Sequence, residues 1–311
     1  MRMKLRWLFL SLAAAGLVVP GVTRAIEVDF SRDTAEGLFE TAEGTVPKVS
    51  DGFATLTVRA GTHLLPVVGG KKYKLEIVAR AEGDFVVEEN DRAHILTLQS
   101  HQHRLSSTCE VVFQNADRKE IPGFGADIPG ARTTPRLFFL TKQLQTSVAV
   151  FYAPQDATGL RLRFRSNDRI TRIASLRLAE ETEENSLIPN PDFRYGELSY
   201  SGWHPQRDGR LYTRPDGKTV FHAGYGGSSP FFPLAEGITY EVTATGTGEK
   251  DKATIQIQYF DKDGKSLLTR FLIRPDPKGA TTRLTPPPGT ASAWIVLYGV
   301  ILEEFRINRV N

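Results

Sequence analysis

Two stretches near the C-terminus, residues 255–259 and 293–298, carry side chains that could bind a ligand rich in hydroxyl groups. In each stretch aromatic or amide side chains alternate with apolar ones, which in a strand places the two kinds on opposite faces. Aromatic rings stack on the apolar faces of sugars, and amides both donate to and accept from hydroxyls. A sheet face shared by both strands would form a sugar platform, whereas the competing interpretation has the two rings filling a core or packing against a second domain. The platform residues are Trp294, Tyr298, Gln256 and Gln258.

A third stretch, residues 160–165, reads LRLRFR and places three arginines on one face of a strand. Guanidinium groups pair bidentately with carboxylates and sulfates, so this row could bind an acidic polysaccharide. The competing interpretation is a solvated face with cross-strand partners such as Glu76 and Glu110. The arginines are Arg161, Arg163 and Arg165.

The loop FHAGYGGSSPFF, residues 221–232, concentrates glycine around three aromatic residues. Tyr225, Phe231 and Phe232 are expected to be exposed there, as in the mobile aromatic loops of many binding sites. A structural crossing between sheets is the alternative. We include Tyr225 among the candidate ligand-binding residues.

Other chemical patterns are weaker. His101 and His103 share one side of a strand but lack a clear third metal ligand, which favours a solvated loop. Cys109 alternates with apolar residues and has no base close by in sequence, which indicates a core residue and not a nucleophile. Residues 261–264, DKDG, open like a calcium loop without its later ligands, which indicates a hairpin turn. We therefore expect no catalytic residue, no cofactor and no metal.

The elements that must position these residues repeat along the chain. The phrase P-x-x-x-G-x-x-Y occurs at residues 66–73 and again at 233–240, and each copy leads into a stretch that alternates with a period of two. Three further segments echo one another in the same order, so a duplicated domain with insertions in the first copy explains the pattern. Those pairs are 111–121 with 257–267, 153–164 with 286–297, and 169–176 with 303–310.

Short strand-like runs separated by turn signals, and no sustained helical periodicity, predict an all-β protein of two tandem antiparallel β-sandwiches. The predicted divisions are residues 1–25 as a leader, 26–178 as the first sandwich with insertions near 82–106 and 121–147, 179–186 as an acidic linker, and 187–311 as the second sandwich.

The first 25 residues have the pattern of a secretory signal peptide: basic residues, an apolar run from Trp7 to Val19, and small residues before Ala25. The run is shorter than the roughly 20 residues needed to span a bilayer, although an uncleaved anchor is the alternative. Without the leader, 35 basic residues face 36 acidic ones, so the charge balance favours neither nucleic acid nor membrane as a partner. We expect an exported protein, periplasmic or extracellular, with no membrane span after leader removal.

Four motifs of the second copy occur in a familiar order. They are LIPNPDF (187–193), Gly202-Trp203, the strand phrase at 233–240, and the hairpin DKDGK (261–265). In this order they resemble the jelly-roll, galactose-binding-like carbohydrate-binding modules found beside bacterial glycoside hydrolases. The resemblance covers nearly all of residues 187–310 and, more weakly, the first copy from about residue 64. It implies tandem jelly-roll modules without catalytic activity.

Such modules often hold a structural calcium ion with an acidic residue just after the opening Phe and an Asp in the last strand. Here those places carry Arg194 and Asn308. A hard cation needs several oxygen ligands, usually including carboxylates. We therefore expect no calcium at this position.

Three functions are compatible with the sequence. The first is an exported, non-catalytic protein that binds a polysaccharide or oligosaccharide and could act beside a separate glycan-degrading enzyme. The second is a protein-interaction or structural β-sandwich protein without affinity for glycans. The third is a hydrolase or lyase built on a jelly roll, which would need titratable groups converging in a cleft.

Overall fold

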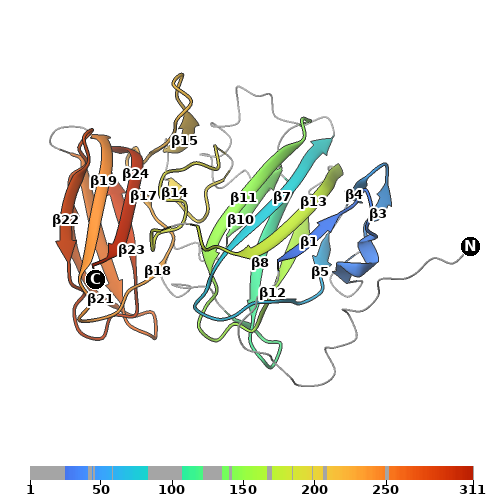
Figure 1. The fold of residues 1–311 in the computed structure, drawn as a ribbon, viewed down its shortest axis with the longest axis horizontal. Helices are drawn as coiled ribbons and strands as arrows, with labels where there is room; N and C mark the ends of the chain where they lie inside the picture. Colours follow the sequence, from blue (N-terminus) through green and yellow to red (C-terminus); the bar gives the residue numbers. More distant parts are fainter. Residues whose placement is uncertain are drawn as a thin grey trace, which may run out of the picture.

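The computed structural model describes residues 25–40, 44, 46–57, 59–82, 107–121, 135–139, 142–166, 170–183, 185–197, 199–205, 209–248 and 252–310. Over these residues the protein is all-β, with several antiparallel sheets and only one short 3-10 helix, η2 (Ala35–Gly37). Figure 1 shows the blue-to-green strands of the N-terminal half at one end of the long axis and the orange-to-red strands of the C-terminal half at the other. The expected all-β class is confirmed.

The N-terminal half contains two sheets. Sheet A has the order β11 (Gln145–Tyr152), β7 (Lys72–Glu82), β13 (Ile170–Glu180), β4 (Phe53–Leu56), β3 (Lys48–Ser50), and β1 (Ile26–Asp29) also pairs with β13. Sheet B has the order β10 (Arg136–Phe139), β8 (Ser107–Gln114), β12 (Gly159–Arg165), β5 (Ala60–Thr62), β2 (Phe39–Glu40). In sheet B, β6 (Leu65–Pro66) pairs with β12 and β9 (Glu120–Ile121) pairs with β8.

The C-terminal half also contains two sheets. Sheet C has the order β21 (Ser266–Ile273), β20 (Thr254–Phe260), β23 (Ser292–Tyr298), β17 (Gly227–Ser228), β14 (His204–Pro205), and β18 (Phe232–Pro233) also pairs with β23. Sheet D has the order β22 (Ala280–Leu284), β19 (Tyr240–Gly248), β24 (Val300–Arg309), β16 (Thr219–His222), β15 (Arg210–Thr213).

The strand order of one half repeats in the other. Sheet A matches sheet D strand for strand, so that β7 beside β13 corresponds to β19 beside β24. Sheet B matches sheet C in the same way, including the additional strand, β6 or β18, that pairs with β12 or β23. Both central pairs also carry a register shift, between Ile173 and Ser175 in one half and between Thr245 and Gly246 in the other.

Local hydrogen bonds repeat as well. The Tyr73 hydroxyl accepts a bond of 2.7 Å from the backbone N–H of Val68, and the Tyr240 hydroxyl accepts one of 3.0 Å from the N–H of Ala235. In both cases the donor lies five residues before the tyrosine. The same side-chain contact therefore fixes the turn that enters β7 and β19.

The hairpin turns that follow β8 and β20 are also equivalent. Asp261 Oδ1 accepts the N–H groups of Asp263 (3.0 Å) and Lys265 (2.9 Å), and Asn115 Oδ1 accepts those of Asp117 (3.1 Å) and Lys119 (3.0 Å). Gly264 has φ 78°, and Arg118, its counterpart in the N-terminal half, has φ 61°. The prediction of a hairpin turn at residues 261–264 is confirmed.

Each half has its own hydrophobic core, because the alternating strands turn their apolar side chains into the space between two sheets. One core draws on residues from Phe30 to Leu178 and the other on residues from Ile188 to Ile307. Cys109 lies in the first core, fully buried, and that burial raises the pKa of its thiol well above the ordinary value. It is the core residue that its alternation predicts, and an inert one.

Two motifs of the family resemblance pack against each other in the second core. Phe193 and Trp203 meet edge to face, with ring centroids 5.1 Å apart, and the Trp203 Nε1–H donates to Pro189 O at 2.8 Å. Gly202 has φ 84°, and a Cβ on it would lie 2.8 Å from Pro230 Cβ. Glycine is therefore required before this tryptophan by both conformation and space.

The segment between the halves is docked onto them. Ala179 and Glu180 still pair with β7, so β13 extends two residues into the predicted linker 179–186. Beyond it, Lys72 Nζ donates to Ser186 O at 2.8 Å, and the Ser186 hydroxyl accepts the N–H of Ile307 at 3.1 Å. The acidic stretch is consequently not a free tether.

Two serine hydroxyls cover the open edge of sheet A. Ser199 and Ser201 accept the backbone N–H groups of Val148 and Val150, each at 3.1 Å. Val148 and Val150 lie two residues apart on edge strand β11, so their N–H groups point the same way. An edge that could otherwise pair with another chain is thereby occupied by the C-terminal half.

Some predictions fall outside the described residues. These are the leader up to residue 24, most of the insertions near 82–106 and 121–147, and the His101 and His103 pair. Within the described ranges, no helix has the length and apolar character needed to cross a membrane.

Replacing either core tyrosine by phenylalanine removes one hydroxyl and leaves the N–H of Val68 or Ala235 without its side-chain acceptor. Because the two contacts are equivalent, Tyr73→Phe and Tyr240→Phe should each lower the free energy of unfolding by about 1 kcal/mol. Urea denaturation measures both. Tyr298→Phe, in an exposed ring, is the control and should leave stability unchanged, whereas a loss confined to one of the two core variants would contradict the equivalence.

Candidate functional site

Strand alternation decides which side chains of sheet C face outward. Alternate residues of β20 and β23, among them Ile257 and Ile295, lie in the second core. The register pairs Gln258 with Trp294, Gln256 with Val296, and Thr254 with Tyr298 on the opposite side. The structure therefore brings the four platform residues to one face, which we call the outer face of sheet C; it consists of Thr254, Gln256, Gln258, Thr269, Phe271, Trp294, Val296 and Tyr298.

Trp294 belongs to an internal hydrogen-bond chain. Its Nε1–H donates to Gln258 Oε1 at 2.8 Å, and Gln258 Nε2 donates to Ser266 Oγ at 2.9 Å. The amide that the sequence suggests for ligand contact is thus hydrogen-bonded to the indole and to Ser266. Gln258 is therefore better suited to positioning Trp294 than to binding a ligand directly.

One face of the indole is covered. Phe231 stacks on Trp294 with ring centroids 5.1 Å apart and an interplanar angle of 26°, and Phe260 approaches edge-on at 6.2 Å. Phe231 and Phe232 are both buried, so the expectation that they are exposed loop aromatics is wrong. They close the sandwich beside β23, because the loop that carries them runs along this strand through β17 and β18.

The accessible rings of the outer face are Tyr298 and Phe271, which are 41% and 55% exposed. Phe271 lies on edge strand β21 opposite Gln256, and Tyr298 lies on β23 two residues beyond the partner of Gln256. Two strand spacings across the sheet and two residues along it therefore separate their backbones, about 12 Å in all. A single sugar ring cannot touch both, whereas a chain of sugars can. Sequence reasoning missed Phe271 because Ser266–Ile273, SLLTRFLI, shows no regular alternation of polar and apolar residues, so the pattern does not say which side chains face outward.

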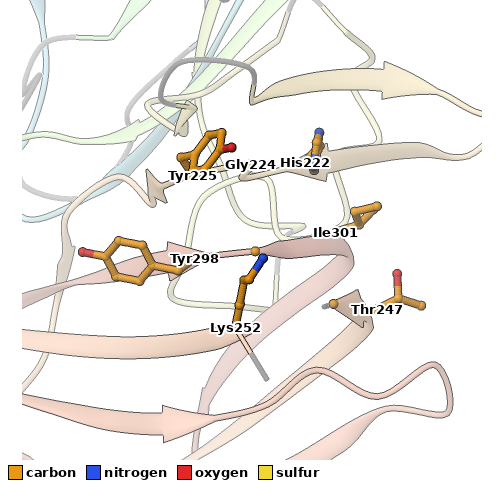
Figure 2. Close-up of a pocket in the computed structure, with 9 residues that line it drawn as sticks. His222, Gly224, Tyr225, Thr247, Lys252, Tyr298 and Ile301 are labelled. Carbon is orange, nitrogen blue, oxygen red and sulfur yellow. The ribbon is translucent and has the colours of Figure 1, made fainter. Parts of the chain in front are cut away.

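A pocket of about 610 Å³ opens where β23 ends. Figure 2 shows Tyr225 and Tyr298 on one side of it and His222, Thr247 and Ile301 on the other, with Lys252 pointing into the space between them. Tyr298 belongs to both the outer face and the pocket. Tyr225, 72% exposed, is therefore brought beside the platform by the fold, although some 70 residues separate the two tyrosines.

The turn that carries Tyr225 is anchored. Gly226 N–H donates to Ala223 O, Ala223 N–H to Val300 O, and Gly299 N–H to Gly224 O, each at 2.9 Å. Residues 223–226 are thus bonded to the turn that follows Tyr298. The expectation of a mobile aromatic loop is not met here: the two tyrosines are carried by turns that are bonded to each other.

The arginine row occupies the equivalent face of sheet B, and its charges are engaged within the protein. Arg161 Nη1 donates to Glu40 Oε2 at 2.6 Å, and Arg163 pairs with Glu120. Arg165 is exposed at the end of β12, whereas Glu110 lies opposite Arg163 in the register. Glu76, suggested as a partner, pairs instead with Arg177 on sheet A. Because Arg161 and Arg163 are already paired with carboxylates of the protein, they are poorly placed to bind an anionic ligand.

An ion pair occupies the position at which the resembling modules often hold calcium. Arg194 donates to both carboxylate oxygens of Asp192, through Nε at 2.8 and 3.0 Å and through Nη2 at 2.6 Å. Burial pushes the pKa of Asp192 up, but the hydrogen bonds and charge of Arg194 outweigh it, and the pKa lies below the ordinary value. Among the described residues, no group of three His, Cys, Asp or Glu side chains is placed to hold a metal ion.

No protein-family model matches the chain, and no curated protein sequence matches it significantly. Similar solved structures include the carbohydrate-binding module BiXyn10A CBM1, at 14% identity over 50% of this chain and 97% of that one, with a TM-score of 0.30.

Two others span more of the chain. The tandem CBM51 modules of a family 98 glycoside hydrolase from Streptococcus pneumoniae are 10% identical over 93% of this chain and all of theirs, with a TM-score of 0.22. Allantoicase from Saccharomyces cerevisiae is 10% identical over 91% of this chain and 88% of its own, with a TM-score of 0.27. The neighbours include carbohydrate-binding modules. Identities and TM-scores this low say nothing about the ligand of this chain.

A calcium chelator should leave the melting temperature of the protein unchanged, because Arg194 stands where a carboxylate ligand would be needed. Differential scanning calorimetry with and without EDTA measures this. A drop of several degrees, restored by added calcium, would show that other oxygens bind the ion.

Asp192→Asn should lower the free energy of unfolding by about 0.2–1 kcal/mol at pH 7, the size of a partly exposed ion pair. A carboxyl whose folded pKa is depressed contributes stability that is present above its unfolded pKa, near 3.8, and is lost as the pH falls through the folded pKa. The difference from wild type should therefore shrink below about pH 4. Urea titrations at pH 7 and pH 3 test it, with Asp263→Asn in an exposed turn as the control.

Proposed function

We propose that the protein is an exported, non-catalytic carbohydrate-binding protein whose ligand lies along the outer face of sheet C. The observation that carries this proposal is the pair of exposed rings, Tyr298 and Phe271, whose backbones lie about 12 Å apart with Gln256 and Thr254 between them. Rings on a polar sheet face match sugars, which offer an apolar ring face and hydroxyls at its rim.

The proposed chain architecture is two jelly-roll sandwiches related by duplication. The matching strand orders, the equivalent Tyr73 and Tyr240 contacts, and the equivalent hairpin turns support it. The duplicated face is polar and aromatic in the second sandwich and ion-paired in the first. We therefore assign ligand binding to the second sandwich and a supporting role to the first.

Affinity should be modest. Stacking on two rings with a few solvated hydrogen bonds corresponds to a Kd in the micromolar to millimolar range, about −4 to −8 kcal/mol. Binding of that strength suits a module that holds a polysaccharide near a separate degradative enzyme, in the periplasm or outside the cell, where the leader-like N-terminus would direct it.

A protein-interaction function is the second candidate, and one observation favours it. Edge strand β21 is exposed over most of its length, with Leu267 and Leu268 39% and 43% exposed. An apolar sheet edge can accept a strand from another protein. Two register shifts in its pairing with β20, near Gln256 and Phe260, interrupt the regular ladder and make such an addition less favourable.

Screening of the mature chain on a glycan array, followed by calorimetry with the best ligand, tests the proposed function. Phe271→Ala and Tyr298→Ala should each weaken binding about tenfold and leave the melting temperature within a few degrees, since both rings are exposed. Trp294→Ala is less informative, because it also removes the Phe231 stack and the Gln258 hydrogen bond.

Val68→Ala, an exposed apolar residue of the N-terminal half, is the matched control and should bind like wild type. Binding that survives both ring substitutions would place the ligand elsewhere. Failure to bind any glycan, together with capture of a protein partner that β21 substitutions abolish, would favour the second candidate.

A further inference from the structure

The pocket beyond Tyr298 differs in chemistry from the outer face that leads to it. Its described lining side chains include two phenols, an ammonium (Lys252) and an imidazole (His222), and none of them is a carboxylate. The outer face, by contrast, offers neutral amide and hydroxyl groups. Among the described residues, a ligand that follows the face into the pocket therefore meets an ammonium and an imidazole that the outer face lacks.

Backbone hydrogen bonds and close packing join the chain segments around the pocket. The two tyrosines are carried by turns that share backbone hydrogen bonds between Ala223 and Val300 and between Gly299 and Gly224. A Cβ on Gly248 would lie 2.3 Å from Ala253 Cβ and 2.9 Å from Gly299 O, so the end of β19 packs without a side chain against Ala253 and against the turn that follows Tyr298. Three chain segments are thus held together around the pocket, which lowers the entropy lost on binding.

We propose, on the basis of the function proposed above, that this pocket takes the terminal unit of the glycan and that this unit bears a carboxylate. The rings of Tyr225 and Tyr298 enclose the sugar, and Lys252 binds its acidic group. An ammonium has three N–H donors, so Lys252 can serve an acceptor within the protein and a ligand oxyanion at once. The ligand class is an oligosaccharide that ends in a uronic or similar acidic sugar.

Placement at the end of β23 supports a terminal unit. Gly299 turns the chain directly into β24, and the pocket lies at the Thr254–Tyr298 end of sheet C, so a glycan that crosses the outer face reaches the pocket last. A volume of about 610 Å³ is in the range of small-molecule sites. One or two sugar units would fill such a space.

The experiment compares uronic-acid oligosaccharides (oligogalacturonides, oligoglucuronates and alginate oligomers) with the same oligomers after reduction of their carboxylates to alcohols. Calorimetry on the full mature chain should show binding about tenfold tighter for the acidic form of at least one pair. Lys252→Gln should abolish that preference, because it weakens binding of the acidic form about tenfold more than binding of the reduced form. The preference should also weaken with added salt.

Lys265→Gln is the matched control. This lysine is also exposed, but it follows β20 at the opposite end of sheet C, so its replacement should leave the preference intact. Melting temperatures of all variants establish that they are folded, and Tyr225→Ala should weaken binding of both forms of the preferred ligand.

The outcomes separate the two proposals. Equal affinity for acidic and reduced oligomers, or a preference that survives Lys252→Gln, overturns the carboxylate assignment and leaves carbohydrate binding standing. Absence of binding to any glycan, acidic or neutral, overturns the proposed function and this inference with it.

Discussion

The pairing of β20 with β23 is the constraint on which the rest of sheet C depends. Its register sets Ile257 opposite Ile295 in the core and Gln258 opposite Trp294 on the outer face. Side chains alternate strictly along a strand, so a slip of one residue would bury the amides and expose the isoleucines. Such a slip would expose a large apolar area to water, and this cost in free energy keeps the register fixed. The register in turn sets the positions of the four platform residues.

The equivalent sheets B and C carry different side chains on their outward faces. Arg161 and Trp294 occupy equivalent positions, on β12 opposite Val112 and on β23 opposite Gln258. In the first sandwich the guanidinium is held by Glu40, and in the second the indole is held by Gln258. The two halves share the strand order and the buried core, whereas their outward faces differ in chemistry.

Rigidity at the pocket has the same origin as rigidity at the junction of the halves. Backbone groups in the turns around Tyr225 and Gly299 are bonded to each other, and backbone groups on β11 are bonded to Ser199 and Ser201. Each exposed main-chain group that finds a partner removes a route for local opening. A protein without internal disulfides, with Cys109 buried, thereby presents a preformed site.

The amino-acid sequence by itself determined the all-β class, the repeated order of segments, the hairpin at Asp261 and the shared face of Trp294, Tyr298, Gln256 and Gln258. These follow from local rules, because strand alternation and turn chemistry act within a few residues. Tertiary structure alone decided that Phe231 and Phe232 are buried, that Phe271 is exposed, and that Tyr225 meets Tyr298.

It also decided that Arg161 and Arg163 are paired with acids 121 and 43 residues away in sequence. Those outcomes depend on which strand lies at a sheet edge and which turns meet at its end. Such long-range contacts leave no periodic signal in a single sequence, since the same residues would satisfy the local rules at an edge or at the centre of a sheet.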